Sequence, residues 1–147
     1  MKYVGSVLIL CACVCFSFFY EIKEKNKLEN LKSMRDFINH IKIKIDYFLT
    51  PQPKLISEYK NDFIKELYKN EFKNLDKYYD KDICSVLKSF FKDLGKGLKD
   101  EEINLCSYTI SKLDDKIKIF EQELPNKIKV VRTMIVFGGA SIILLII

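Results

Sequence analysis

The sequence predicts an all-α protein: a small helical bundle flanked by an N-terminal transmembrane helix and a C-terminal apolar membrane helix. An uncharged apolar stretch lies at each end of the 147-residue chain. Between them, apolar residues recur every three or four positions, which is the spacing of one helix face. No segment shows strand-like alternation. We therefore divide the chain into residues 3–20 as a transmembrane anchor, 21–127 as the helical bundle and 128–147 as a C-terminal membrane segment.

The N-terminal segment, residues 3–20, carries no charged side chain. A helix of this length spans roughly 27 Å, close to the hydrocarbon thickness of a bilayer. A cleaved secretory signal has a shorter apolar run and a small-residue cleavage site, so a retained anchor is favoured. The rival interpretation is a bacterial lipoprotein signal, because Leu10-Cys11-Ala12-Cys13 places a small residue before a cysteine. The apolar run would then continue beyond the lipidated Cys13.

The first helix of the bundle is expected to continue straight out of the N-terminal segment and to end near Leu49. Its apolar stripe consists of Leu28, Leu31, Met34, Phe37 or Ile38, Ile41, Ile45 and Phe48. Thr50 and Pro51 are a favourable N-cap and first helical residue for the next helix. Pro53 in its first turn costs little, since that N–H has no partner within the helix. The pattern predicts a sharp corner here.

Two further helical regions are expected in the middle of the bundle. Residues 56–79 keep apolar spacing without Gly or Pro, and we interpret them as one or two short helices. Asp82 is expected to cap a following helix. Leu94 ends that helix's apolar stripe, and Gly95 to Gly97 then provide a stop that tolerates left-handed backbone.

The last long helix is expected to start at Asp100 as its cap. Its apolar stripe is the clearest in the chain and consists of Ile103, Cys106, Ile110, Leu113, Ile117, Phe120 and Leu124. Such a stripe predicts packing against another helix. Pro125 is expected to kink or interrupt the helix before the membrane segment begins at Ile128.

The C-terminal segment is apolar but short. Residues 134–147 are uncharged and cover about 21 Å as a helix, so a full crossing has to recruit residues from 128 onward. Lys129 and Arg132 would then extend back to the interface. Small residues at 138–141 either allow close approach of a second helix, with residues 3–20 as its partner, or are ordinary small residues of a membrane helix.

The charge distribution predicts the orientation. Basic residues lie on the inner side of both end segments: Lys23, Lys25, Lys27, Lys32, Arg35, Lys127, Lys129 and Arg132. Only Lys2 lies outside. By the positive-inside rule the bundle is cytoplasmic. The net charge of +5 comes from lysines that alternate with acidic residues, as on a solvated helix surface, so we expect no nucleic-acid partner.

No residue pattern predicts catalysis, a cofactor or a metal. His40 is the only histidine, lies off the apolar stripe, and is expected at the surface without a second ligand nearby. Gly95-Lys96-Gly97 is too short for a phosphate loop. No disulfide framework is expected from the five cysteines, Cys11, Cys13, Cys15, Cys84 and Cys106. We therefore expect no enzyme and no small-molecule substrate.

Three features together resemble the stage III sporulation protein AB family. IDYFLTP at residues 45–51 resembles that family's I-x-Y-x-x-T-P corner, and FFKDLG at residues 90–95 resembles its F-G-x-x-L-G turn. An amphipathic helix running into a Gly-containing apolar tail resembles its C-terminus. The chain departs from the family pattern at Phe91, Leu98 and Glu102, where the family has Gly, Asp and Gln.

The resemblance implies a non-enzymatic platform subunit of a sporulation channel between mother cell and forespore, required for spore development. The family is similar to the F-type platform proteins of type II secretion systems. The implied partners are the lipid bilayer, other membrane subunits of the channel and a secretion-type ATPase, and the implied location is the mother-cell membrane around the forespore. The candidate interaction residues are Tyr47, Thr50, Pro51, Pro53, Leu94, Gly95 and Gly97. The alternative is a tethered helical lipoprotein or an unrelated membrane-anchored coiled-coil protein.

Overall fold

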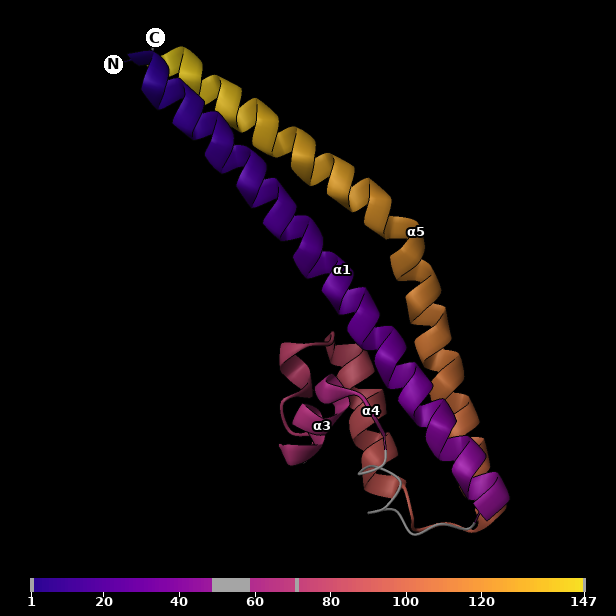
Figure 1. Cartoon of the computed structure of the whole chain (residues 1–147). Helices are drawn as coiled ribbons and strands as arrows, with labels where there is room; N and C mark the ends of the chain where they lie inside the picture. Colours follow the sequence, from indigo (N-terminus) through magenta and orange to yellow (C-terminus); the bar gives the residue numbers. More distant parts are fainter. Residues whose placement is uncertain (1, 49–58, 71, 147) are drawn as a thin grey trace. The chain divides into compact units, whose positions relative to one another are not determined.

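The computed structural model describes residues 2–48, 59–70 and 72–146, and its elements are helical (Figure 1). In chain order they are α1 (Lys2–Phe48), α3 (Asp62–Lys69), the 3₁₀ helix η1 (Leu75–Lys77), α4 (Lys81–Asp93) and α5 (Lys99–Ile146). No strand occurs among these residues. The all-α prediction is therefore confirmed.

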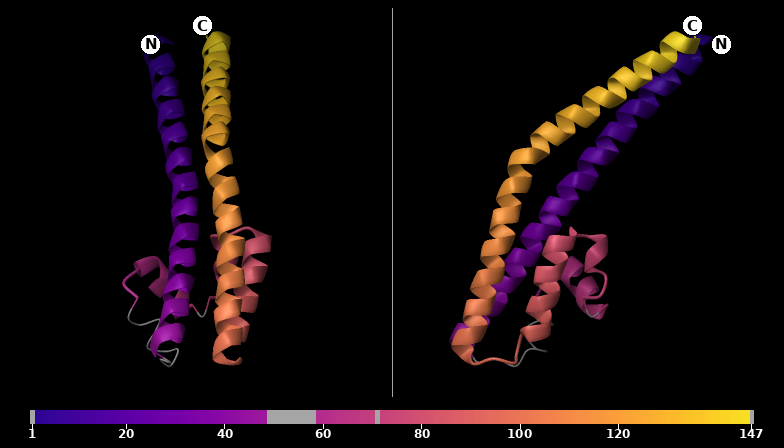
Figure 2. Two further views of the ribbon diagram at one scale, coloured as in Figure 1. Left: turned by 90° about the vertical axis from the view of Figure 1, so that its right-hand side faces the viewer. Right: turned by 180° about the vertical axis from the view of Figure 1, so that it is seen from behind.

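The chain forms two compact units. We call residues 1–26 and 119–147 the terminal pair, and residues 27–118 the central bundle. Within the terminal pair, the start of α1 and the end of α5 run side by side in opposite directions, with both chain ends together (Figures 1 and 2). No helix in the described part of the chain is both long and apolar enough to cross a membrane, so the structure does not support the two flanking transmembrane helices. The membrane boundaries of residues 3–20 and 128–147 stay predictions.

The core of the central bundle is built from apolar stripes of four helical elements. Buried side chains with almost no exposed surface include Phe37 and Ile41 of α1, Ile64 and Leu67 of α3, Leu87 and Phe90 of α4, and Cys106 and Leu113 of α5. Fully burying one such side chain contributes about 1.5 to 3 kcal/mol. The stripes predicted on the first and last helices are thus confirmed as core faces over residues 28–45 and 103–117.

The predicted first corner falls at the edge of the described residues. Helix α1 ends at Phe48, next to the predicted end at Leu49. Thr50, Pro51 and Pro53 lie outside the described residues, so the expected cap and corner stay predictions.

The prediction of one or two short helices at residues 56–79 is confirmed by α3 and η1. The start of α3 is fixed by Asn61, whose side-chain oxygen accepts hydrogen bonds from the N–H groups of Phe63 (3.0 Å) and Ile64 (3.3 Å). After its end, the N–H of Phe72 donates to the carbonyl of Leu67 (2.9 Å). Phe72 has a φ of 55°, an uncommon left-handed conformation for an aromatic residue.

Both predicted helix starts were wrong by two residues. Asp80, not Asp82, precedes α4, and Asp82 lies in the first turn. Helix α5 begins at Lys99, so Asp100 is inside the helix, and Glu101 accepts a hydrogen bond from the N–H of Leu98 (3.0 Å). Acidic residues stabilise the first turn as well as the cap, because both positions face the positive end of the helix dipole. The presence of acidic residues therefore does not determine which residue begins the helix.

Two further predictions concern single residues. Of the kink or interruption expected at Pro125, the interruption is absent, because α5 continues through this residue, and the kink stays a prediction. Proline removes only one hydrogen bond of the ladder, and the exposed ring at this position needs no core space. His40 is not a plain surface residue: its ring lies 5.3 Å from that of Tyr59, and its Nε2 atom is buried without a hydrogen-bond partner among the described residues.

Candidate interaction surface

The turn between α4 and α5 contains three of the predicted site residues. Leu94 ends α4, donates its N–H to the carbonyl of Phe90 (2.9 Å) and packs its half-buried side chain against the core. Gly95 follows with a φ of 84°, where a side chain would be strained. Leu94 thus anchors the turn to the core of the bundle, and Gly95 allows the chain to turn.

Position 97 requires a glycine because the side chain of Glu101 approaches it closely. A Cβ atom at this position would lie 2.9 Å from Oε2 and 3.2 Å from Cβ of Glu101. The same Oε2 accepts the hydrogen bond of the Leu98 N–H, so the glycine leaves room for the contact that starts α5. Next to it, Leu98 is 75% exposed. A large apolar side chain is therefore held in solvent on a well-fixed turn.

The end of α1 lies beside this turn. The ammonium group of Lys99 lies 3.2 Å from Oδ1 of Asp46 and also donates to the Asp46 carbonyl. Tyr47 follows Asp46 in the last turn of α1. The structure therefore brings the predicted residue Tyr47 and the Gly95 to Gly97 turn to the same end of the central bundle. Thr50, Pro51 and Pro53 are outside the described residues.

Acidic side chains give this end of the bundle its charge. A pocket beside the turn is lined by Asp93, Lys96, Gly97, Glu101, Glu102 and Leu105. Its one cation, Lys96, lies 3.9 Å from Asp93, so the other two carboxylates are not balanced within the lining. We call the Leu94 to Leu98 turn, this pocket and the end of α1 the end surface. Sequence reasoning missed the acidic residues, although their spacing around the glycines was visible.

The described residues hold no group of three or more His, Cys, Asp or Glu side chains placed to bind a metal ion. All five cysteines are free. Burial raises the pKa of Cys84 and of Cys106 from 9.0 to about 11. Both thiols are therefore protonated at neutral pH and are poor nucleophiles. The end surface therefore presents a defined shape, one exposed leucine and negative charge.

The terminal pair has its own specific contacts. Arg132 of α5 donates to Glu21 of α1 (2.9 Å), and Lys25 donates to the same residue (2.7 Å). Further along, Gly139 is buried against Cys13: a Cβ atom on the glycine would lie 2.8 Å from the cysteine sulfur. The close approach expected of the small residues at 138–141 is thus realised at Gly139, with the N-terminal segment as the partner.

One family model matches the chain. The model described as stage III sporulation protein AB matches residues 2–82 and 59–147. These two ranges together cover all but the first residue of the 147. No curated protein and no solved structure matches the chain.

Proposed function

This chain belongs to the stage III sporulation protein AB family, and we propose that it is a membrane-anchored, non-enzymatic platform subunit of the sporulation channel between mother cell and forespore. The family makes it a sporulation protein. The platform role rests on how the molecule distributes its apolar residues. The central bundle buries them, whereas the terminal pair leaves large uncharged side chains exposed.

Those exposed side chains support the membrane anchor. Phe19, Phe137 and Leu144 are each exposed over 70% or more of their surface, and Phe16 over 66%. Exposed apolar area costs about 25 cal/mol per Å² in water, and contiguous patches of it are rare on soluble monomers. Lipid removes this cost. We propose that the terminal pair inserts as a helical hairpin in the mother-cell membrane.

The basic residues that flank the uncharged segments support a cytoplasmic position for the central bundle. In that position the end surface is available to cytoplasmic partners. We propose that it contacts a secretion-type ATPase of the channel, while the hairpin contacts other membrane subunits. Exposed Leu98 and the carboxylates of Glu101 and Glu102, which have no cation of their own in the pocket lining, are the groups that a protein partner with an apolar and basic patch would recognise.

Site-specific photo-crosslinking during sporulation tests this role. A photoreactive amino acid replaces Leu98 on the end surface or, as a matched control, Lys81, which is exposed at the other end of α4 about 20 Å away along the helix. We expect the probe at 98 to crosslink to the channel ATPase and the probe at 81 not to do so. Equal crosslinking at both positions, or at neither, would contradict the proposed contact.

A further inference from the structure

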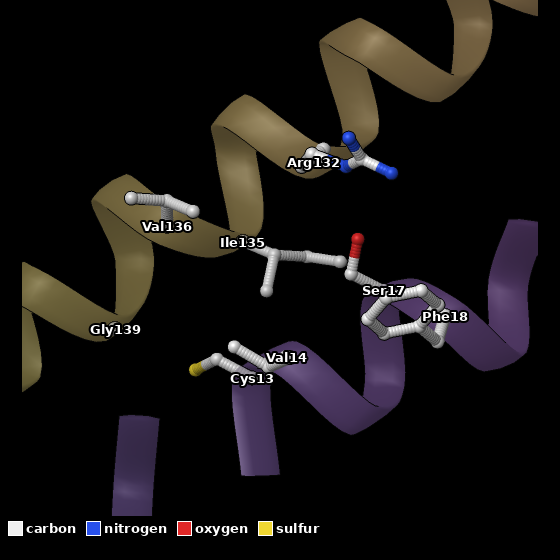
Figure 3. A pocket seen from close by; sticks show the side chains of 8 residues that line it. All are labelled: Cys13, Val14, Ser17, Phe18, Arg132, Ile135, Val136 and Gly139. Atoms are coloured by element: carbon white, nitrogen blue, oxygen red, sulfur yellow. The ribbon is translucent and has the colours of Figure 1, made fainter. Parts of the chain in front are cut away.

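A groove runs between the two helices of the terminal pair (Figure 3). Its volume is about 270 Å³. Its sides are formed by Val14, Ser17, Phe18, Ile135 and Val136. The whole lining extends over residues 13–18 of α1 and 132–139 of α5, which is roughly 8 Å and 10 Å along the two helices. Apart from the hydroxyl of Ser17, the sides are apolar.

The two ends of the groove differ in chemistry. One end closes where Gly139 meets Cys13. The other end carries the guanidinium of Arg132, beyond which α5 has no further charged residue. The groove therefore has a cation at one end and apolar sides along the uncharged part of both helices. This arrangement is complementary to an amphiphile with an anionic head.

The charges at the open end favour an anion. Arg132 and Lys25 both pair with the single carboxylate of Glu21, at 2.9 and 2.7 Å. Two cations on one anion leave one positive charge in this cluster. The guanidinium has five N–H donors, and its side chain is 56% exposed. It therefore has donors available for a phosphate, which guanidinium groups bind well.

We propose that this groove binds one anionic phospholipid, with an acyl chain along the apolar sides and the phosphate at Arg132. The inference rests on the proposed membrane location and adds to it a defined lipid site. The phosphate pairs with the positive charge of Arg132, and the acyl chain fills a space that the side chains of neither helix fill. A second copy of the hairpin and a neutral lipid are the competing occupants.

Native mass spectrometry of the full chain, extracted in detergent, tests the site. Phosphatidylglycerol is added, and phosphatidylcholine serves as the zwitterionic comparison. We expect Arg132→Gln to weaken phosphatidylglycerol binding about tenfold, the effect of losing one charge-assisted contact. Lys129→Gln removes the same charge one turn away, at an exposed position outside the groove, and should change binding less than twofold.

A second variant changes the apolar part of the groove. Ser17→Leu fills the groove without changing charge, and should weaken phosphatidylglycerol binding even if Arg132→Gln proves too unstable to study. Equal losses in Arg132→Gln and Lys129→Gln would overturn the proposal, because they indicate charge attraction without a site. Equal binding of phosphatidylcholine would overturn the assignment of an anionic head.

The competing protein occupant also has a distinct outcome. A dimer that survives delipidation and binds no phosphatidylglycerol would overturn the lipid site. Because the measurement uses extracted protein, its failure is separate from failure of the membrane anchor. A chain that stays in the membrane fraction at alkaline pH but binds no lipid refutes the groove alone. A chain that leaves that fraction refutes both.

Discussion

Gly139 lies against Cys13 in the terminal pair, and this contact is testable by chemistry. In Gly139→Cys the new Cβ would lie 3.8 Å from the Cβ of Cys13, about the mean distance in disulfides. Mild oxidation should therefore link α1 to α5, visible as a linked peptide in mass spectrometry. Gly138→Cys is the matched control, since nothing lies within 4 Å of a Cβ at Gly138.

The crosslink also discriminates between two interpretations of the N-terminus. It requires residue 13 to carry a free thiol within a retained helix. A lipoprotein acylated at Cys13 would give no linked peptide with Gly139→Cys. Linking with Gly138→Cys as efficiently as with Gly139→Cys would contradict the register of the two helices.

The buried thiols predict a loss of stability at alkaline pH. Burial raises the pKa of Cys84 and Cys106 to about 11, while the unfolded chain releases these protons near 9.0. As a raised pKa stabilises the fold fully only below the unfolded value, stability should fall between pH 9 and 11, by about 1 to 3 kcal/mol per thiol. Helical circular dichroism during alkaline titration measures it.

The control for this titration is the double variant Cys84→Ala, Cys106→Ala. It lacks both thiols and keeps every other titratable group of the chain. Its stability should fall less steeply between pH 9 and 11 than that of the native chain. Parallel profiles would show that the thiols do not carry the effect.

At the scale of elements, the turn between α4 and α5 depends on one left-handed residue. Gly95 has a φ of 84°, so Gly95→Ala should destabilise the central bundle by about 1 to 2 kcal/mol. Gly95→Asn should lose less, because asparagine tolerates this conformation. Thermal unfolding of both variants tests the turn, and an alanine variant as stable as the asparagine variant would contradict it.

Helix α5 contains a proline that costs stability. Pro125 lacks the N–H that would reach the carbonyl of Glu121 and lies exposed inside the helix. Pro125→Ala should raise stability by up to about 3 kcal/mol. Gln122→Ala, at an exposed site of the same helix, should change it by less than about 0.5 kcal/mol. Both values come from thermal unfolding, and no gain in Pro125→Ala would show that the local structure offsets the lost bond.

The long helices were predictable from the sequence, and their ends and contacts were not. Many turns of regular apolar spacing specify α1 and α5, since a period of 3.6 is a strong signal over such lengths. Phe72 has a left-handed backbone conformation, which the sequence does not indicate because the residue is not a glycine. The contact of Gly139 with Cys13 depends on the register of helices more than a hundred residues apart in sequence. Such a register follows from three-dimensional packing, not from local pattern.

The candidate site was predictable to a similar degree. Leu94, Gly95 and Gly97 were recognised because turn chemistry is local in sequence. Their proximity to the end of α1 was not, because it depends on the Lys99 contact with Asp46 across more than fifty residues. The position of His40 against Tyr59 was missed for the same reason.

At the scale of the whole molecule, the chain uses apolar residues in two ways. In the central bundle they form a core, and in the terminal pair many stay exposed. The first use specifies a fold in water, and the second suits a lipid environment. The proposed platform role needs both, because a partner-binding bundle acts at a membrane only when the same chain anchors it there.

Cysteine accessibility in intact, non-sporulating bacterial cells that express the chain in their cell membrane tests this account most directly. Lys2→Cys and Ser111→Cys are introduced singly into a chain without native cysteines; Ser111 is exposed in the central bundle, whereas native Cys106 is buried and unsuitable. The account predicts that an impermeant maleimide labels the cysteine at position 2 from outside, and the one at position 111 only after permeabilisation. Labelling of position 111 in intact cells would contradict the cytoplasmic platform.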